Sequence, residues 1–275
     1  MDDLVTIERD GHVATLTMNR PEVRNAQNSA LIDALDAAFA GCGSDDSVHV
    51  VVLAGAGPSF SSGHDLKELG PDAAADDLRR LRGTPEGRLR HEQAMYFERC
   101  MTIHDFPKPT IARVQGACIA AGLMLACMCD LIVAADDAVF QNPVLRMTGA
   151  GVELLVEPWE LGARKAKEFL FTGDPIDAAE AWRLGMVNRV VARDDIEAET
   201  MALAQRIAAL PPVTVALVKK SVNKTFDLMG KRDAFDFHFM LHQFAHGTAT
   251  SQEALAERRE KASVRDIVAD RDRDF

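Results

Sequence analysis

The sequence lacks several features that would place the protein in other classes. It has no apolar run long enough to cross a bilayer. Its first residues, Met1-Asp2-Asp3-Leu4, have neither the basic block nor the apolar block of a secretion signal. A Walker sequence, a complete dinucleotide fingerprint and an H-E-x-x-H pair are also missing. We therefore expect a cytoplasmic protein with no membrane span and no nucleotide cofactor held by these motifs.

Positive charge and cysteine are also limited. The 31 Lys and Arg residues face 42 Asp and Glu residues, and the net charge of −11 weighs against nucleic-acid binding. A local basic cluster can still hold the phosphates of a small ligand. The five cysteines are odd in number and three of them crowd into Cys118, Cys127 and Cys129, so we expect no disulfide framework. Cys127-x-Cys129 has no matching second pair and predicts no metal site.

Strand and helix signals alternate along the chain. Val5–Ile7 and His12–Met18 flank Asp10-Gly11, a good hairpin turn. A helix is predicted from Asn28 or Ser29 to near Gly43, with Leu31, Leu35 and Phe39 on one face. Further strands are predicted at 48–53, 110–114, 131–134 and 187–191. This alternation favours an α/β architecture, and 275 residues can bury one main core.

Two later segments break the alternation. Between Gly70 and Arg90 the composition shifts to alanine and acidic residues and then to Arg, Gly and Pro, which is typical of a surface stretch. A helix is predicted after it, from about Thr84 to His104. Beyond Pro211-Pro212 the pattern is helical to near the end, with an apolar stripe at Met240, Leu241, Phe244 and Ala245.

The most informative segment is Gly116–Asp130, where small residues lead directly into an apolar helix. Small side chains allow a ligand to approach the main chain, and the first N–H groups of a helix have no internal acceptor. Such groups can stabilise a developing oxyanion. A second loop of this kind is Phe60-Ser61-Ser62-Gly63-His64-Asp65-Leu66-Lys67. Two donor loops polarise a carbonyl from two sides, as in the stabilisation of a thioester enolate.

Both segments, in this order, resemble the crotonase (enoyl-CoA hydratase/isomerase) superfamily, which writes them as A-F-S-x-G-x-D-L and K-P-x-I-A-x-V-x-G-x-x-x-G-G-G. Further matches are Asn19–Ala26, Lys108–Ala112, Thr172–Ala178 and Gly185–Val191. The resemblance implies a spiral of repeated β-β-α units over residues 1–210. It also implies a C-terminal helical region over 211–275 that packs a homotrimer or a dimer of trimers. In this family the 70–90 region borders the acyl pocket, although a plain solvated loop is an equal alternative.

The resemblance also assigns site residues. The oxyanion donors would be the backbone N–H groups of His64 and Ala121, and Ala121 would need a negative φ because it replaces a glycine. Coenzyme A would be part of the substrate, with no separate cofactor and no metal. Lys219 and Lys220 are weaker candidates for the nucleotide. The other positions placed against coenzyme A or the acyl chain are Arg24, Ser62, Asp65, Lys67, Ala120, Met124 and Val144.

The acid and base of the family are missing. Hydratases of this family use two glutamates, and this chain has Met124 and Val144 at those positions. Glu153 is the candidate replacement, expected at a helix start facing the acyl carbons. Beside Val152, Leu154 and Leu155 its pKa would be raised, which suits a group that takes a proton from carbon. The alternative is an exposed residue that stabilises the helix dipole.

One further pattern is a row of histidines, His238, His242 and His246, at four-residue spacing on one predicted helix. No carboxylate or cysteine is placed in the sequence to complete a metal site with them, so a packing or interface role is expected.

Three functions follow from these observations. The first is an enoyl-CoA hydratase-like enzyme of fatty acid metabolism that stabilises a thioester enolate. The second is a Δ3,Δ2-enoyl-CoA isomerase-like enzyme that uses Glu153. The third is a non-catalytic acyl-CoA binder, which the loss of both glutamates would allow.

Overall fold

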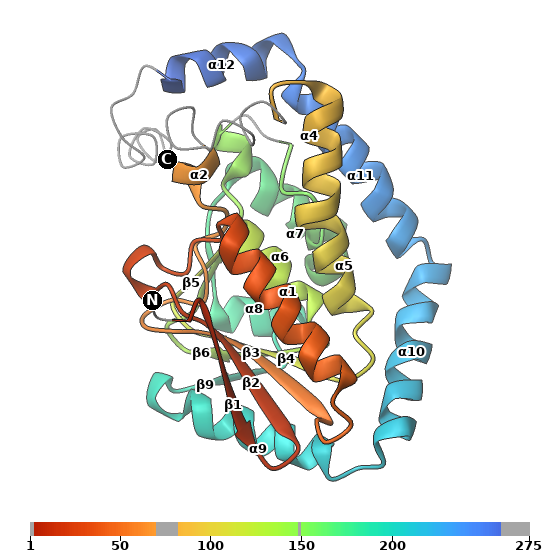
Figure 1. Cartoon of the computed structure of the whole chain (residues 1–275). Helices are drawn as coiled ribbons and strands as arrows, with labels where there is room; N and C mark the ends of the chain where they lie inside the picture. The colour runs from red at the N-terminus through yellow and green to blue at the C-terminus, as the bar shows by residue number, and fades with distance from the viewer. Residues whose placement is uncertain (1–2, 70–81, 148–149, 260–275) are drawn as a thin grey trace.

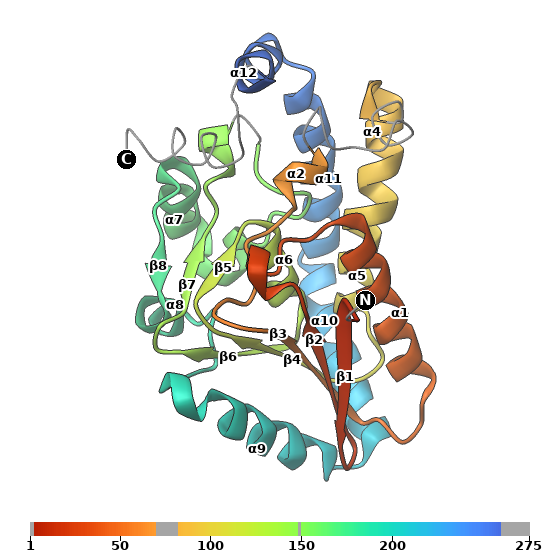
Figure 2. The same cartoon turned by 60° about the vertical axis from the view of Figure 1, so that its left-hand side comes forward.

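A computed structural model describes residues 3–69, 82–147 and 150–259. Its centre is a six-stranded sheet in the order β1-β2-β3-β4-β6-β9 (Figures 1 and 2). The strands of this sheet are β1 (Val5–Asp10), β2 (Val13–Met18), β3 (Val50–Gly55), β4 (Thr110–Val114), β6 (Leu131–Ala135) and β9 (Arg189–Val191). The pair β1–β2 is an antiparallel hairpin and the other pairs are parallel. The α/β architecture is therefore confirmed.

A second, smaller sheet lies beside the first. It consists of β5 (Ala117–Ile119), β7 (Val139–Gln141) and β8 (Ile176–Asp177), in that order. Because β5 directly precedes α6 (Ala121–Met128), this sheet fixes the position at which that helix begins. The same strand is paired by Ser61 on the other side, through an isolated bridge to Cys118.

The two faces of the large sheet bury two separate cores. Val50 and Val52 of β3 pack toward α9 (Ile196–Ala208), which crosses below the sheet in both views (Figures 1 and 2). Their neighbours Val51 and Leu53 point to the opposite face, as the alternation of a strand requires. That face is covered by α1 (Ser29–Ser44) and α6, and the candidate site lies on this side.

The start of α1 shows why the sequence prediction was right there. The Asn28 side chain accepts a hydrogen bond from the Leu31 N–H at 2.9 Å, which caps one of the free donors of the first turn. Leu31, Leu35 and Phe39 are buried on one face as predicted. Other helices described before residue 210 include η1 (Pro21–Val23), α2 (Leu66–Leu69), η3 (Val144–Met147), α7 (Glu157–Thr172), α8 (Ala178–Leu184) and η4 (Arg193–Asp195).

The predicted helix over 84–104 is confirmed, but it is not uniform. It consists of α4 (Pro85–Glu92), one π-helical turn η2 (Gln93–Phe97) and α5 (Glu98–His104). Thr84 caps its start by accepting from the Gly87 N–H at 3.1 Å. The preceding surface stretch was predicted at 70–90, and its residues 70–81 lie outside the described residues.

Over residues 212–259 the chain is helical, as predicted, and residues 260–275 lie outside the described residues. It contains α10 (Pro212–Leu228), α11 (Lys231–His246) and α12 (Ala249–Arg259), with α10 and α11 running along one side of the molecule (Figure 1). The helix α11 packs against α4, so the late helices close the side of the site opposite the sheet. In the described part of the chain, no single helix is long and apolar enough to cross a membrane. One pair, 193–208 with 212–228, passes such a test only together and is bent by 104°.

Candidate active site

The two predicted donor loops lie directly against each other. A side chain at Gly63, which has φ +89°, would meet the Ile119 carbonyl at 2.8 Å. A side chain at Gly122 would meet the Ser61 carbonyl at 2.5 Å. Both positions therefore require glycine, one for its backbone conformation and both for the close approach of the loops. Ser61 fixes the upstream loop, because its hydroxyl donates to the Asn25 carbonyl at 2.9 Å.

The backbone N–H groups of His64 and Ala121 have no hydrogen-bond acceptor among the residues that the structure describes. Ala121 is fully buried and has a negative φ, as its substitution for glycine demanded. The backbone strain lies one residue earlier, at Ala120, with φ 51° and ψ −113°. A β-carbon disfavours this conformation, which costs on the order of 1–3 kcal/mol. Two free donors on touching loops can hold one anionic oxygen.

A small apolar cavity of about 30 Å³ lies between α1, α5 and α6. Leu31 and Leu35 line it from α1, Cys100 and Ile103 from α5, and Met124 from α6. The His64 side chain also lines this pocket, whereas Glu153 does not. Other titratable residues, such as Tyr96 and Cys100, also line the pocket, and His64 is the one that belongs to a donor loop.

The His64 side chain contacts Glu153, which the sequence did not reveal. His64 Nε2 lies 3.1 Å from Glu153 Oε2, across a separation of 89 residues. Both side chains are shielded from water, with the Glu153 side chain 4% exposed. The other ring nitrogen, His64 Nδ1, is buried and has no hydrogen-bond partner within the described ranges. The imidazole therefore has one nitrogen bound to a carboxylate and one nitrogen free.

Tyr96, the only tyrosine of the chain, packs against the imidazole of His64. Its ring lies 4.1 Å from the His64 ring, and it comes from the π-helical turn η2. Burial raises the pKa of Tyr96 well above its usual range, so its hydroxyl stays protonated. A π turn often marks a functional site, and this turn directs Tyr96 against His64.

Two expectations for Glu153 are wrong. It lies in an irregular loop, since α7 begins only at Glu157, and the neighbouring Gly151 has φ 116°. Its pKa is lowered, not raised. Burial alone would raise the pKa, but the His64 imidazole opposite and its hydrogen bond outweigh burial. The carboxylate is thus ionised and buried behind the histidine, where it can orient the ring but cannot reach the pocket.

The two positions of the missing glutamates remain apolar in space. Met124 is buried and lines the pocket, and Val144 lies half-buried in η3. Glu157 lies near Val144 in the sequence but is buried, accepting a hydrogen bond from Asn142 at 2.6 Å. Burial raises the pKa of Glu157. Asn142 binds one of its carboxylate oxygens, and the other, Oε2, is buried without a hydrogen-bond partner in the described residues.

The positions expected near coenzyme A divide into exposed and bound residues. Arg24 and Lys67 are exposed, and the Arg24 carbonyl accepts from the N–H of Ser62, so the basic residue lies next to the donor loop. Asp65 is bound to Arg20 at 3.0 Å and braces the loop. Lys219 is paired with Asp130 at 2.8 Å and its side chain is 8% exposed, so the expectation of a phosphate role for it is wrong.

The expectation that no carboxylate completes the histidine row is also wrong. Glu92 of α4 reaches His242 and His246 of α11, and the three ligand atoms lie within 4.8 Å of one another. His238, the first of the row, is bound to the Val152 carbonyl at 2.8 Å through its Nε2. Fold contacts across 150 residues create this cluster, which sequence spacing alone could not show.

Comparison with known proteins agrees with this geometry. The model of the enoyl-CoA hydratase/isomerase family matches residues 8–265. The chain belongs to this family. It is 44% identical over 254 residues to the "Putative enoyl-CoA hydratase EchA13" of Mycobacterium tuberculosis, covering 86% of this chain and 78% of that protein.

Solved structures of the family show the same fold. A "probable ENOYL-COA Hydratase" from Mycobacterium smegmatis has a TM-score of 0.84 at 44% identity, covering 91% of this chain and 97% of the other. An enoyl-CoA hydratase/isomerase from Xanthobacter autotrophicus Py2 has a TM-score of 0.88 at 31% identity, covering 99% and 98%. The expected crotonase-type fold is confirmed, and the protein is an enzyme of the enoyl-CoA hydratase/isomerase family.

Proposed function

We propose that the protein moves a proton on the acyl part of an enoyl-CoA thioester, with the His64 imidazole as its acid and base. The thioester oxygen would lie between the N–H groups of His64 and Ala121. The observation that carries this proposal is the contact of His64 Nε2 with Glu153 at the wall of the apolar pocket. Glu153 is a positioning residue in this scheme, because it acts through the histidine.

The tautomer follows from the partners of the ring. A proton on Nε2 is donated to the Glu153 carboxylate, and this leaves the lone pair of Nδ1 free. Nδ1 then takes a proton from the carbon between the double bond and the thioester carbonyl. The electron pair of the broken C–H bond forms an enolate, whose oxygen charge the two N–H groups stabilise. The buried carboxylate stabilises the imidazolium that forms.

Double-bond isomerisation is the reaction that this set of groups supports best. The proton on Nδ1 returns to the far carbon of the extended enolate, which shifts the double bond by one position and regenerates the base. No water and no second carboxylate are required, in keeping with Met124 and Val144 at the glutamate positions. One histidine can serve as both the acid and the base of such a shuttle.

Hydration is the second candidate, and the names of the relatives favour it. In that case the same imidazole would take a proton from water and give it to the carbon next to the thioester. A non-catalytic acyl-CoA binder is the third candidate, favoured by the two apolar replacements. Several further expectations stay predictions. They are that coenzyme A is part of the substrate, that no further cofactor is needed, that Arg24 and Lys67 bind the phosphates of coenzyme A, and that the protein is cytoplasmic.

The homotrimer or dimer of trimers also stays a prediction, as does the division into a core over 1–210 and an oligomerisation region over 211–275. The apolar stripe of α11 supports it, because Met240 and Phe244 are exposed in the single chain. Exposed apolar area of this kind is typical of surfaces that meet another protein.

The experiment is mass spectrometry of 2-enoyl-CoA and 3-enoyl-CoA thioesters incubated with the enzyme in D2O. A shifted double bond with deuterium in the acyl chain is the expected result. A gain of water would favour hydration. Unchanged thioesters that nevertheless bind would leave only the binder. His12→Ala is the control variant, because His12 lies in the turn of the β1–β2 hairpin, where its ring hydrogen-bonds the Ser47 carbonyl at 2.8 Å and does not line the pocket.

A further inference from the structure

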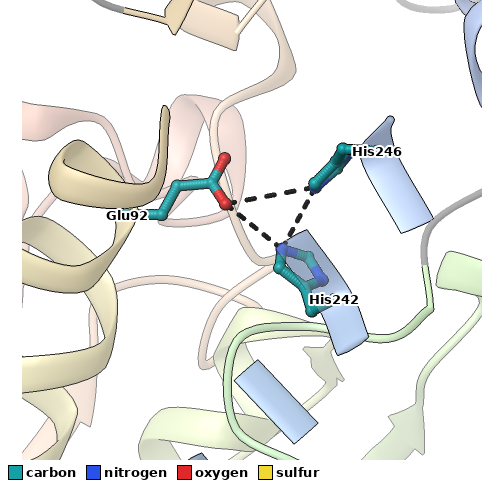
Figure 3. A group of neighbouring side chains, drawn as sticks. All are labelled: Glu92, His242 and His246. Carbon is teal, nitrogen blue, oxygen red and sulfur yellow. Dashed lines mark hydrogen bonds and ion pairs between the residues drawn. The ribbon is translucent and has the colours of Figure 1, made fainter. Parts of the chain in front are cut away.

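A second cluster of histidine and glutamate lies between α4 and α11 (Figure 3), and its three residues are not among those that line the pocket. His242 Nε2 lies 3.1 Å from His246 Nε2 and 3.3 Å from Glu92 Oε2. His246 Nε2 lies 4.0 Å from the same carboxylate oxygen. Figure 3 shows the three side chains pointing toward one another from two helices.

The spacing of these atoms matches a metal-ligand triangle. The three distances place the ligand atoms at about 2 Å from one common point, which is the usual length of Zn–N and Zn–O bonds. Histidines four residues apart on a helix are neighbours on one face, so α11 presents two nitrogens side by side. The carboxylate from α4 supplies the third ligand from across the helix interface.

Hydrogen bonds alone satisfy this triangle poorly. The nitrogens face each other, so only one can carry a proton in the gap, and that single proton must serve the other nitrogen and the carboxylate together. A divalent cation would satisfy all three lone pairs at once.

The groups around the triangle hold the carboxylate in place. Gln243 donates to Glu92 Oε2 at 2.6 Å, and Arg82 pairs with Oε1 at 3.0 Å. Such outer contacts orient a metal-binding carboxylate. Glu92 and His242 are buried, whereas the His246 side chain is 28% exposed and gives an ion access from solvent.

We infer that Glu92, His242 and His246 bind a divalent transition metal of the zinc type. Two imidazoles and one carboxylate suit Zn²⁺, and water would complete the coordination on the side of His246. The ion would tie α4 to α11. Because Tyr96 follows Glu92 by one turn, the same tie would steady the wall that contacts His64.

The test is titration of the metal-free full chain with Co²⁺, followed by displacement with Zn²⁺. We expect visible absorption bands of a four- or five-coordinate Co²⁺ site at one equivalent, lost on addition of Zn²⁺. Zn²⁺ should also raise the melting temperature, because it binds only the folded chain. His246→Ala should weaken binding at least about 100-fold, and Gln243→Leu about 10-fold through loss of the outer contact.

His12→Ala is the matched control. His12 and His49 form another close histidine pair, with rings stacked 4.0 Å apart, but no carboxylate joins them in the group of possible ligands. This variant should keep the full affinity. Circular dichroism of each metal-free variant shows whether the fold is retained. Absence of the Co²⁺ bands, or equal affinity of His246→Ala and His12→Ala, would overturn the inference. Neither result depends on turnover, so the proposed reaction is judged separately.

Discussion

The protein contains two buried clusters built from the same residue types, and they differ in what surrounds them. His64 and Glu153 form a pair whose histidine faces an apolar pocket and two free N–H groups. Glu92, His242 and His246 form a triangle that lies between two helices. One free nitrogen beside a pocket suits proton transfer, whereas three converging lone pairs suit a cation. The surroundings, more than the residue types, decide the chemistry.

The clusters also differ in backbone strain. Within the part of the chain that the structure describes, the non-glycine residues with positive φ are Arg24, Asn25 and Ala120. All three belong to the loops around the oxyanion donors. The second cluster lies on regular α-helix at each of its ligands. Backbone strain is therefore found at the loops whose N–H groups are proposed to bind the substrate, and it is not found at the cluster in which only side chains would bind.

The largest expected effect comes from His64→Ala, which removes the proposed acid and base from the first cluster. Turnover of 3-enoyl-CoA should fall on the order of 10²–10⁴-fold, as is usual for loss of a general acid–base residue. Acyl-CoA binding should persist, because the backbone donors remain. Steady-state kinetics and calorimetric binding on the same protein check this. Loss of binding with intact turnover of the bound fraction would argue against the role.

Glu153→Gln should have a smaller effect, because it leaves the histidine in place but removes the charge that orients it. We expect kcat to fall about 100-fold with little change in KM, and Glu153→Asp to recover part of the loss. The dependence of kcat on pH should change in Glu153→Gln as well. An equal loss in both variants, with an unchanged pH profile, would instead indicate a purely structural carboxylate.

The second cluster should control acid stability in the metal-free protein. The pKa of His246 is about 4 in the folded state, below the usual 6.5. Its contribution to stability is therefore complete above pH 6.5 and is lost as the pH falls toward 4. His242 contributes with the opposite sign. Burial would lower its pKa, but the hydrogen bond to Glu92 raises it, so its contribution is complete below pH 6.5 and is lost as the pH rises above that value. Glu92 has a pKa of about 2 in the folded state, so its contribution to stability is lost as the pH falls below about 4.5. The lowered pKa of Glu153 adds a loss of the same sign, as the pH falls below its unfolded value.

Urea unfolding between pH 7 and 4 with a chelator present checks this prediction. Between pH 7 and 4, the free energy of unfolding of His246→Gln should fall less than that of the wild type, by on the order of 1–2 kcal/mol. This figure allows for the partial exposure of the ring. His12→Ala, on the exposed hairpin, should follow the wild-type curve. Parallel curves for the wild type and His246→Gln would show that the ring does not titrate with folding.

The smallest effect concerns the strain of the donor loop. Ala120→Gly should raise the free energy of unfolding by up to about 1 kcal/mol, since relief of the positive φ outweighs the extra freedom of the unfolded chain. Ala121→Gly is the matched change at a negative φ, and it should lower the stability by about 0.5–1 kcal/mol. Thermal or urea unfolding of the two variants compares them directly. The same sign for both would contradict the strain at Ala120.

Local sequence signals predicted most of the fold. The Asp10-Gly11 hairpin, the Asn28 cap and the strand at Thr110–Val114 depend on neighbours within a few residues, and all three are confirmed. The two donor loops were predicted because glycine and alanine stand where the chain must approach itself. Their free N–H groups in the structure support that assignment.

The side-chain chemistry could not be predicted in the same way. The sequence pointed to His64 for its N–H and to Glu153 as a lone acid, but their contact spans 89 residues. Glu153 was expected at a helix start because its apolar neighbours resemble one, while Gly151 bends the chain into a loop. The contact between Glu92 and His242 spans 150 residues, and the sequence around His242 does not indicate which carboxylate it contacts. Only the packing of α4 on α11 brings them together.

The π turn at Gln93–Phe97 has a consequence for insertions and deletions in this helix. In an ordinary helix each residue advances the direction of its side chain by roughly 100°, so removing one residue from the turn would rotate one end of the segment against the other. With Glu92 kept against α11, Tyr96 would swing away from His64, and the reverse would hold if Tyr96 were kept. A π turn contains one residue more than an α-helical turn, and that residue sets the rotation of Tyr96 relative to Glu92. Deletion of one residue here would therefore separate either Tyr96 from His64 or Glu92 from the histidines of α11, although every residue of the two clusters would be unchanged.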